Sequence, residues 1–279
     1  MPVYSTIKLT PWQYILIFSY TIASGMASYK RMTKDVIKKA DVLLEVVDAR
    51  FPDETRNSEI ERDISRAKKS LIIVLNKCDL VPKDKLEKTK SRLSKIAPTV
   101  FVSSKDRSGT TILRHKILET ANKKSGEILV GSLGYPNTGK SSVINAVTGR
   151  HRAGTSSISG HTKGVQHINA GSRIKFIDTP GVIPFGENDE NIQGMLAVKD
   201  ATHLQDPIGV SMTIIEKICA ENKTFLESFY HITIEGQDSY EVLELIGRQS
   251  NFLKKKAEVD ETRAAVKIIN DWQKGLLMV

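Results

Sequence analysis

The stretch EILVGSLGYPNTGKSSVINAVTG, residues 127–149, decides the fold of this chain. It predicts an apolar strand, a glycine-bearing loop and a helix in direct succession. Gly134, followed after four residues by Gly139-Lys140-Ser141, has the spacing of a phosphate-binding loop, whose glycines let backbone N–H groups turn toward phosphates. The N-terminus of the following helix adds the positive end of its dipole. The stretch therefore predicts a site for a nucleoside phosphate.

The side chains of this loop have distinct expected roles. Lys140 would place its positive charge on the β- and γ-phosphates, and the Ser141 hydroxyl can bind magnesium. The residues that we expect to line the phosphates are Pro136, Asn137, Thr138, Gly139, Lys140, Ser141 and Ser142.

The tetrapeptide NKCD, residues 76–79, comes at the end of another apolar stretch, SLIIVLNKCDL, residues 70–80. A carboxylate at Asp79 can accept hydrogen bonds from the ring N–H and the amino group of guanine, whereas adenine would leave it unpaired. The alkyl stem of Lys77 can lie over the base. Ser103-Ser104-Lys105 follows a third strand, where a backbone N–H can meet the guanine carbonyl. The predicted base-binding residues are Asn76, Lys77, Asp79, Ser103, Ser104 and Lys105.

DTPG, residues 178–181, also ends a predicted strand. Asp178 would hold magnesium through water, and the N–H of Gly181 would sense the γ-phosphate. Thr162 lies between the phosphate loop and DTPG and is the candidate switch threonine that meets magnesium and the γ-phosphate in the triphosphate state. We therefore predict Lys140, Thr162 and Gly181 as catalytic, and Ser141, Thr162 and Asp178 as the magnesium site.

Strand and helix alternate up to about residue 184, which predicts an α/β fold: a doubly wound, mostly parallel sheet with helices on both faces. The expected strands cover 42–50, 70–80, 99–109 and the start of 127–149, with a hairpin over 165–181 turned at Ala170-Gly171. The expected helices between them cover 29–40, 58–68, 82–97 and 110–124. After Pro184 the pattern predicts helices only, at 206–220, 239–251 and 260–275. We predict a domain over 26–184 and an all-helical domain over 190–279.

The charge of the chain is unevenly distributed. The net charge is +9, and residues 26–126 hold 24 Lys and Arg against 14 Asp and Glu, while residues 191–279 hold 10 against 13. A polyanion such as RNA suits a basic face, and a lysine-rich solvated surface would show the same composition. The two cysteines have no paired spacing, which argues against a disulfide framework or a zinc site and favours a reducing, cytoplasmic location.

The N-terminus carries an apolar run, WQYILIFSYTIA, residues 12–23. The run is shorter than the roughly 20 apolar residues of a transmembrane helix. It loosely fits the apolar core of a signal peptide, but everything after it is typical of a cytosolic protein. We expect residues 1–25 to be an extension, with Met26 as the functional start, and no stable membrane association.

The order of these motifs is unusual: base-specificity motif, base-contact motif, phosphate loop, switch threonine, then DTPG. The set resembles the translation-factor-like GTPases, and the order resembles the circularly permuted GTPases of the YlqF/YawG group (ribosome biogenesis GTPase A-like). DARFPDETRN, residues 48–57, resembles the DARxPxxxRN hallmark of that group, as do the GHTKG context at 160–164 and DETRAAVKIINDWQKG at 260–275. The resemblance implies GTP hydrolysis with magnesium and binding to ribosomal RNA or a pre-ribosomal particle in large-subunit assembly. No oligomer is required.

The resemblance leaves the water-positioning group open. Val182 stands where many GTPases carry a glutamine, and Gly25 stands where the group carries the histidine of a GHM motif. His161 is the nearest imidazole in the sequence, although an ordinary loop residue explains it more simply. Asn137 suggests another device, because the asparagine of an NxGKS loop helps to bind a potassium ion that neutralises transition-state charge. We expect slow hydrolysis that potassium and a ribosomal partner accelerate.

Permutation also changes how the chain is connected, because the strand ending in DTPG leads directly into the helical region. A nucleotide-dependent movement of DTPG is therefore expected to reach residues 190–279. Two other functions fit the sequence. The chain could be a GTPase with another RNA-related or membrane-associated role, or a guanine-nucleotide-binding module with negligible turnover.

Overall fold

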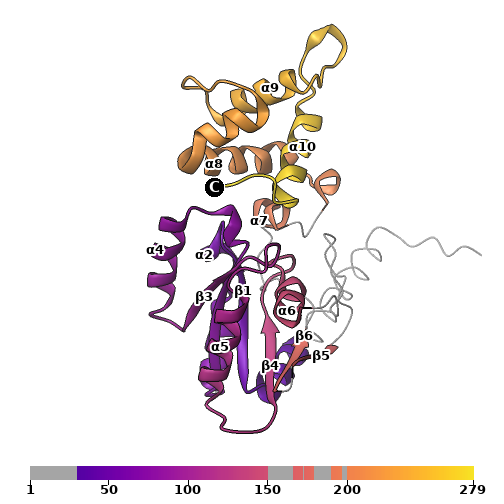
Figure 1. Ribbon diagram of the computed structural model, residues 1–279. Helices are drawn as coiled ribbons and strands as arrows, with labels where there is room; N and C mark the ends of the chain where they lie inside the picture. The colour runs from indigo at the N-terminus through magenta and orange to yellow at the C-terminus, as the bar shows by residue number, and fades with distance from the viewer. Residues whose placement is uncertain (1–29, 150–165, 172, 179–189, 197–199) are drawn as a thin grey trace, which may run out of the picture.

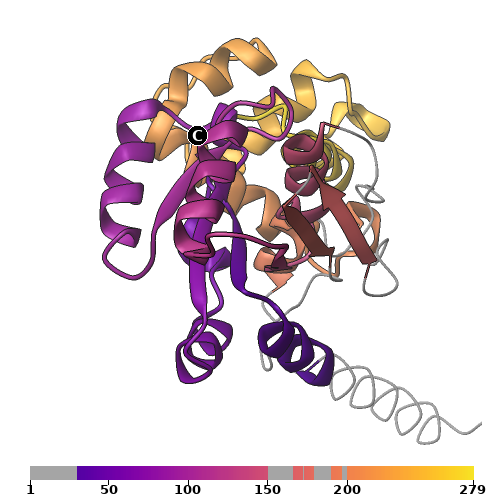
Figure 2. The same cartoon turned by 60° about the horizontal axis from the view of Figure 1, so that its bottom comes forward.

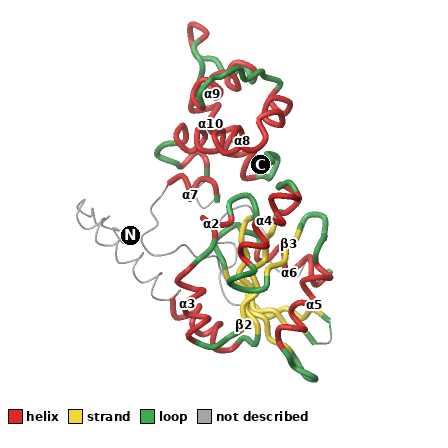
Figure 3. The backbone as a smooth tube through the Cα atoms, turned by 90° about the vertical axis from the view of Figure 1, so that its left-hand side faces the viewer, coloured by secondary structure: helices red, strands yellow, loops and turns green. Residues whose placement is uncertain are grey.

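The computed structural model describes residues 30–149, 166–171, 173–178, 190–196 and 200–279 (Figure 1). These residues form a sheet flanked by helices, with a group of helices at one end of the sheet. Figure 3, turned by 90°, shows the helical group at one end of the molecule and the strands with their flanking helices at the other.

A six-stranded sheet forms the centre of the α/β part. Its strands are β1 (Val42–Asp48), β2 (Ser70–Asn76), β3 (Thr99–Val102), β4 (Ile128–Leu133), β5 (Gln166–Ala170) and β6 (Ile174–Asp178). They are arranged in the order β3-β2-β1-β4-β6-β5, and of these six strands only β5 runs antiparallel, as the first strand of a hairpin with β6. The predicted mostly parallel sheet is confirmed. β1 is wholly buried, as expected for a strand covered on both faces.

Helices cover both faces of this sheet. The helices of this part are α2 (Pro52–Thr55), α3 (Ser58–Arg66), α4 (Lys83–Leu93), α5 (Thr110–Ala121) and α6 (Lys140–Thr148), together with residues 30–39. On one face, α5 and α6 pack on alternate residues of the central strands. On the other face, the helix of residues 30–39 packs beside α3, and Figure 2 shows these two helices at the near end of the molecule. The arrangement is doubly wound, as predicted.

The strands are shorter than the sequence pattern predicts. The strands expected at 42–50, 70–80 and 99–109 end at Asp48, Asn76 and Val102. The chain turns sharply after β2, because Lys77 adopts a left-handed conformation (φ 62°) and Cys78–Leu80 forms a 3-10 turn. The residues beyond each strand end are therefore loop residues at the carboxyl edge of the sheet, where ligands bind in open α/β sheets.

The helical group contains α7 (Glu190–Met195), α8 (Pro207–Tyr230), α9 (Ser239–Gln249) and α10 (Glu261–Gln273), with a short 3-10 turn at Ala201–His203. Aspartates cap the three long helices: Asp206, Asp238 and Asp260 each accept a backbone N–H of the first turn. The helix expected at 206–220 continues to Tyr230, through a kink at Asn222. Among the described residues, no helix is long and apolar enough to cross a membrane.

The helical group and the sheet share one apolar core. Phe51, directly after β1, meets Trp272 of α10 with their ring centroids 5.7 Å apart. The indole N–H of Trp272 donates to the Met195 carbonyl (3.1 Å), and the Gln273 side chain donates to the Gly194 carbonyl (2.7 Å). α10 therefore contacts both α7 and the carboxyl end of β1.

Candidate nucleotide-binding site

The phosphate loop between β4 and α6 has the backbone that its glycines allow. Gly134 (φ 138°) and Gly139 (φ 94°) both adopt conformations that side chains disfavour. A Cβ at Gly134 would overlap the Val46 carbonyl oxygen of β1, and a Cβ at Gly139 would overlap the Asn76 amide nitrogen. Both positions therefore require glycine, for conformation and for space.

Lys140, the first residue of α6, lies buried inside this loop. Its ammonium donates to the carbonyls of Tyr135 (2.6 Å) and Gly134 (3.1 Å). Burial lowers the pKa of Lys140 to about 8, against a partly compensating attraction from Asp178. The charge is thus held by neutral carbonyls, and a phosphate at the N-terminus of α6 would be a stronger partner.

Ser141 and Asp178 form the candidate magnesium site. The Ser141 hydroxyl donates to Asp178 Oδ2 at 2.7 Å, which joins the start of α6 to the end of β6. Neither the Asp178 region nor any other group of described residues gathers three His, Cys, Asp or Glu side chains that could hold a metal. A sparse donor set of this kind fits magnesium, which is usually bound by one or two protein oxygens, water and substrate phosphates.

Asn76, the last residue of β2, connects the two halves of the candidate site. Its amide nitrogen donates to the Thr138 carbonyl of the phosphate loop (2.8 Å), and its amide oxygen accepts the Ser104 N–H (3.3 Å). Asn76 therefore holds three loops in fixed relative positions. Ser103 is buried and exchanges hydrogen bonds with Asp106, while the Lys105 side chain is exposed.

Lys77 has a partner that its motif does not predict. Its ammonium lies 2.6 Å from Asp48 Oδ2, at the end of β1, and a quarter of its side chain is exposed. Asp48 also binds Arg50, and neither acid nor guanidinium was among the predicted site residues. The DARFPDETRN stretch, which contains Asp48 and Arg50, was the available signal, but it indicated only a resemblance to a protein family and not a contact with Lys77.

Several predicted residues lie outside the described part of the chain. These are the catalytic candidates Thr162 and Gly181, together with His161, Val182 and Gly25. The described residues bring together Asn76, Lys77, Asp79, Ser103, Ser104, Lys105, the loop 134–142 and Asp178 along one edge of the sheet. The edge combines a phosphate-binding loop, a hydroxyl–carboxylate pair and a base-specificity loop, which is the chemistry needed to bind a guanine nucleotide.

Two family models match the chain, each over less than half of it. The model described as "50S ribosome-binding GTPase" matches residues 129–230. The nucleotide-binding domain of the CobW/HypB/UreG family matches residues 11–103.

Curated relatives match nearly the whole chain. An uncharacterized GTP-binding protein of Methanocaldococcus jannaschii is 42% identical over 252 residues, covering 89% of this chain and 65% of the relative. Nucleolar GTP-binding protein 2 of Pneumocystis carinii is 33% identical over 270 residues, covering 92% of this chain and 55% of the relative. The chain thus spans between half and two thirds of the length of these relatives.

Two solved structures share the fold. GNP-bound YlqF from T. maritima matches with a TM-score of 0.57 and 24% identity, covering 88% of this chain and 93% of YlqF. A GDP-bound YlqF structure matches with a TM-score of 0.56 and 22% identity, covering 87% and 93%. In the sheet described above, the base-specificity loop precedes the phosphate loop in the chain, and the loops nevertheless meet at one edge. Fold, motif order and relatives agree: the chain has the fold of the circularly permuted GTPase YlqF and is similar over most of its length to GTP-binding proteins.

Proposed function

We propose that the protein binds GTP and GDP with magnesium, hydrolyses GTP to GDP and phosphate, and acts as a switch in assembly of the large ribosomal subunit. The observation that carries the proposal is the Asn76 side chain, which joins the base-specificity loop to the phosphate loop. These hydrogen bonds hold the loop that carries Asp79, the predicted guanine-binding carboxylate, next to the phosphate loop. The names of the relatives, which include nucleolar GTP-binding proteins and a ribosome-binding GTPase family, support the ribosomal part.

Co-sedimentation with large ribosomal subunits tests the assembly role. We expect the protein to pellet with 50S particles in the presence of a non-hydrolysable GTP analogue and to remain in the supernatant with GDP. Equal, low recovery in both states would favour a GTPase with another role. Multiple-turnover phosphate release, measured with and without subunits, separates a switch from a binding module, because only a switch shows turnover that subunits raise.

Hydrolysis by the protein alone should be slow, because Val182 cannot orient water as a glutamine does. Asn137 supports potassium as the compensating cation. It lies in the phosphate loop in a left-handed conformation (φ 59°), between the buried Pro136 and Thr138. We expect faster GTP hydrolysis in potassium than in sodium, and an Asn137→Ala variant that no longer distinguishes the two. Equal rates in both salts for the unmodified protein would refute potassium activation.

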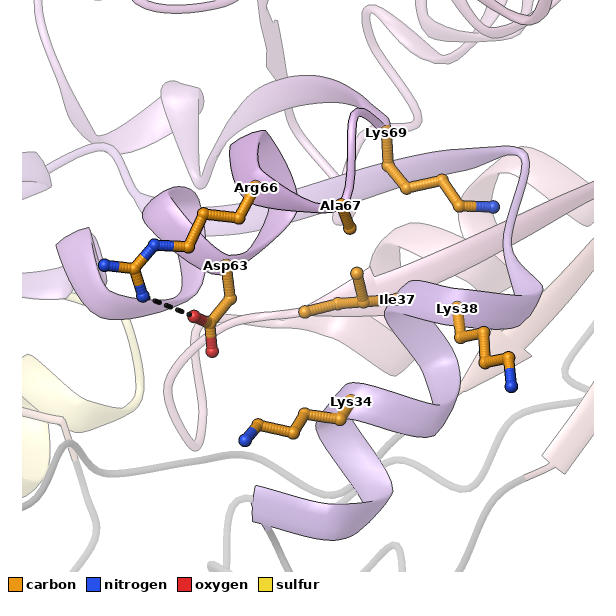
Figure 4. A pocket seen from close by; sticks show the side chains of 7 residues that line it. All are labelled: Lys34, Ile37, Lys38, Asp63, Arg66, Ala67 and Lys69. Carbon is orange, nitrogen blue, oxygen red and sulfur yellow. Dashed lines mark ion pairs between the residues drawn. The ribbon is translucent and has the colours of Figure 1, made fainter.

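A groove on the basic half supports contact with RNA (Figure 4). Lys34 and Lys38 project from the helix of residues 30–39, and Arg66, the last residue of α3, and Lys69, which follows α3, line the other side of the groove. Asp63 is the acidic residue in the lining and pairs with Arg66 at 3.5 Å. The floor contains Ile37 and Ala67. Two lines of cations along a groove suit the phosphates of an RNA strand, whose binding releases counterions. Residues 82–95, with α4, and Lys254–Lys256 are further predicted contacts.

The groove can be tested with a matched pair of variants. Lys34→Gln with Lys38→Gln should weaken binding to ribosomal RNA and reduce the steepness of its salt dependence by about 1–2 in log–log slope. Lys116→Gln with Lys124→Gln removes the same charge from the α5 side of the sheet and should leave the slope unchanged. Equal slopes for both variants would place the RNA elsewhere.

The domain boundaries 26–184 and 190–279 and a cytoplasmic location remain predictions.

A further inference from the structure

Arg50 is a buried cation that bridges the sheet and the helical group. Its side chain is 1% exposed. Nε and Nη2 donate to Asp48 Oδ1 (3.0 Å) and Oδ2 (2.9 Å), and Nη1 donates to the Trp272 carbonyl at the end of α10 (2.8 Å). The guanidinium also lies 4.0 Å from the centroid of the Trp272 ring. If a buried guanidinium of this kind loses a partner, its charge is left uncompensated away from water, which destabilises the folded state.

Asp48 carries this bridge into the base-specificity loop. It is fully buried and binds both the Arg50 guanidinium and the Lys77 ammonium. Burial raises the pKa of Asp48, but Arg50 and Lys77 together outweigh it and hold the pKa well below its usual range. The carboxylate therefore stays charged and provides a firm anchor for Lys77.

Lys77 needs such an anchor because of its backbone. A left-handed conformation is unfavourable for a residue that carries a side chain, so surrounding contacts must hold it. The turn that follows places Asp79 two residues later, and the Leu80 N–H closes it on the Lys77 carbonyl (3.0 Å). The Leu80 carbonyl in turn accepts the N–H of Val279 (3.1 Å). The turn is thus bound directly by Val279 at Leu80, and at Lys77 it is connected to Trp272 through Asp48 and Arg50.

We propose that Asp48 and Arg50 are positioning residues for guanine recognition, through which the helical group fixes the Lys77 stem and the turn that presents Asp79. This inference rests on the proposed guanine-nucleotide binding. In this proposal both residues act through Lys77 and not by binding the nucleotide themselves. The helical group supplies the Trp272 carbonyl that locks Arg50, Arg50 orients Asp48, and Asp48 sets the direction of Lys77. Base recognition in this protein is therefore shared between the sheet and the last helix.

The test is a double-mutant cycle in the full-length chain, read out by GDP affinity in calorimetry. Arg50→Lys keeps the charge but loses the fork that joins Asp48 to Trp272. We expect it to weaken GDP binding about 10-fold, and Lys77→Ala to weaken it to a similar degree. If Arg50 acts through Lys77, then Arg50→Lys should change GDP affinity less than about twofold in the Lys77→Ala background.

Two controls separate positioning from general damage. Arg56→Lys removes a comparable fork, because Arg56 grips both oxygens of Glu61 at 2.9 Å, yet it lies outside the chain of contacts to Lys77 and should leave GDP affinity unchanged. Inorganic tripolyphosphate, which has no base, should bind the Arg50→Lys variant and the unmodified protein equally.

The outcomes are distinct. If the unmodified protein binds no GDP, the proposed function fails. If it binds GDP and Arg50→Lys either has no effect, weakens tripolyphosphate equally, or acts in full in the Lys77→Ala background, the positioning role alone is overturned. Should Arg50→Lys melt below the assay temperature, Asp48→Asn replaces it in the same cycle with the same criteria.

Discussion

The two halves of the sheet hold their ligand groups in different ways. On β4 and β6, the phosphate half, Lys140 is held by carbonyls of its own loop, five and six residues away. On β1 and β2, the base half, Lys77 is held by Asp48, and Asp48 is held by an arginine bound to a residue 222 positions further along the chain. The contacts that hold the Lys140 ammonium are therefore local in the chain, whereas those that hold Lys77 extend to a distant part of it.

Asp79→Asn should have the largest effect on GDP affinity, and it should impair recognition of the base without affecting the phosphate loop. The amide can no longer accept hydrogen bonds from both the ring N–H and the amino group of guanine, and a site built to pair such groups discriminates strongly. We expect GDP affinity to fall ~100-fold or more, while XDP, which carries a carbonyl in place of the amino group, gains affinity. Competition binding with both nucleotides measures this. Retained preference for GDP would mean that Asp79 does not read the base.

A smaller effect is expected at Lys140 in the phosphate loop, where GDP binding should be linked to proton uptake. Its pKa of about 8 lies below the usual value for lysine, so near pH 8.5 most of the free protein carries a neutral amine. Binding of phosphates favours the ammonium, and GDP binding should therefore take up a fraction of a proton and weaken as the pH rises above 8. Calorimetry in buffers of different ionisation enthalpy measures the uptake.

The same pKa shift fixes the sign of its effect on folding. The unfolded chain binds more protons at Lys140 between about pH 8 and 10.5, so this group makes the nucleotide-free protein more stable as the pH rises through that window.

The control for the proton uptake on GDP binding is Lys140→Arg, which keeps its charge at these pH values and should show no proton uptake. Uptake that persists in this variant would assign the proton to another group.

Glu45 provides the smallest expected effect on nucleotide binding, because its ionisation acts on stability only. It lies fully buried on β1, where burial, helped by the charge of Glu61, raises its pKa to about 8. The native state then binds more protons than the unfolded chain from about pH 4.5 to 8, so stability falls as the pH rises through this range, by at most about 1.4 kcal/mol per pH unit.

Glu45→Gln should flatten this pH dependence, because the amide oxygen can still accept the Asn57 N–H that Glu45 Oε1 accepts at 2.7 Å. Thermal melting at several pH values measures the slope, and GDP affinity serves as a control that should not move. A variant with the same slope as the unmodified protein would show that Glu45 is ionised throughout.

The sequence predicted what depends on neighbouring residues and missed what depends on distant ones. The phosphate loop, the parallel sheet and the meeting of NKCD with that loop follow from local patterns and from the shared edge of parallel strands. The roles of Asp48 and Arg50 do not, because their partner Trp272 reads as an ordinary apolar residue of a helix. The predicted strands extended past the observed strand ends, because no glycine or proline marks the turn where an apolar run passes into polar loop residues such as Lys77.

The long separation between Arg50 and Trp272 has a consequence during synthesis. Chains are synthesised at about 5–20 residues per second, so the 222 residues from Phe51 to Trp272 take about 10–45 s to be made. During that interval β1, β2 and β3, which are neighbours in the sheet, can already pair, while Arg50 still lacks its carbonyl. If Arg50 positions Lys77 as proposed, selective binding of guanine begins only once the last helix has been translated and has docked.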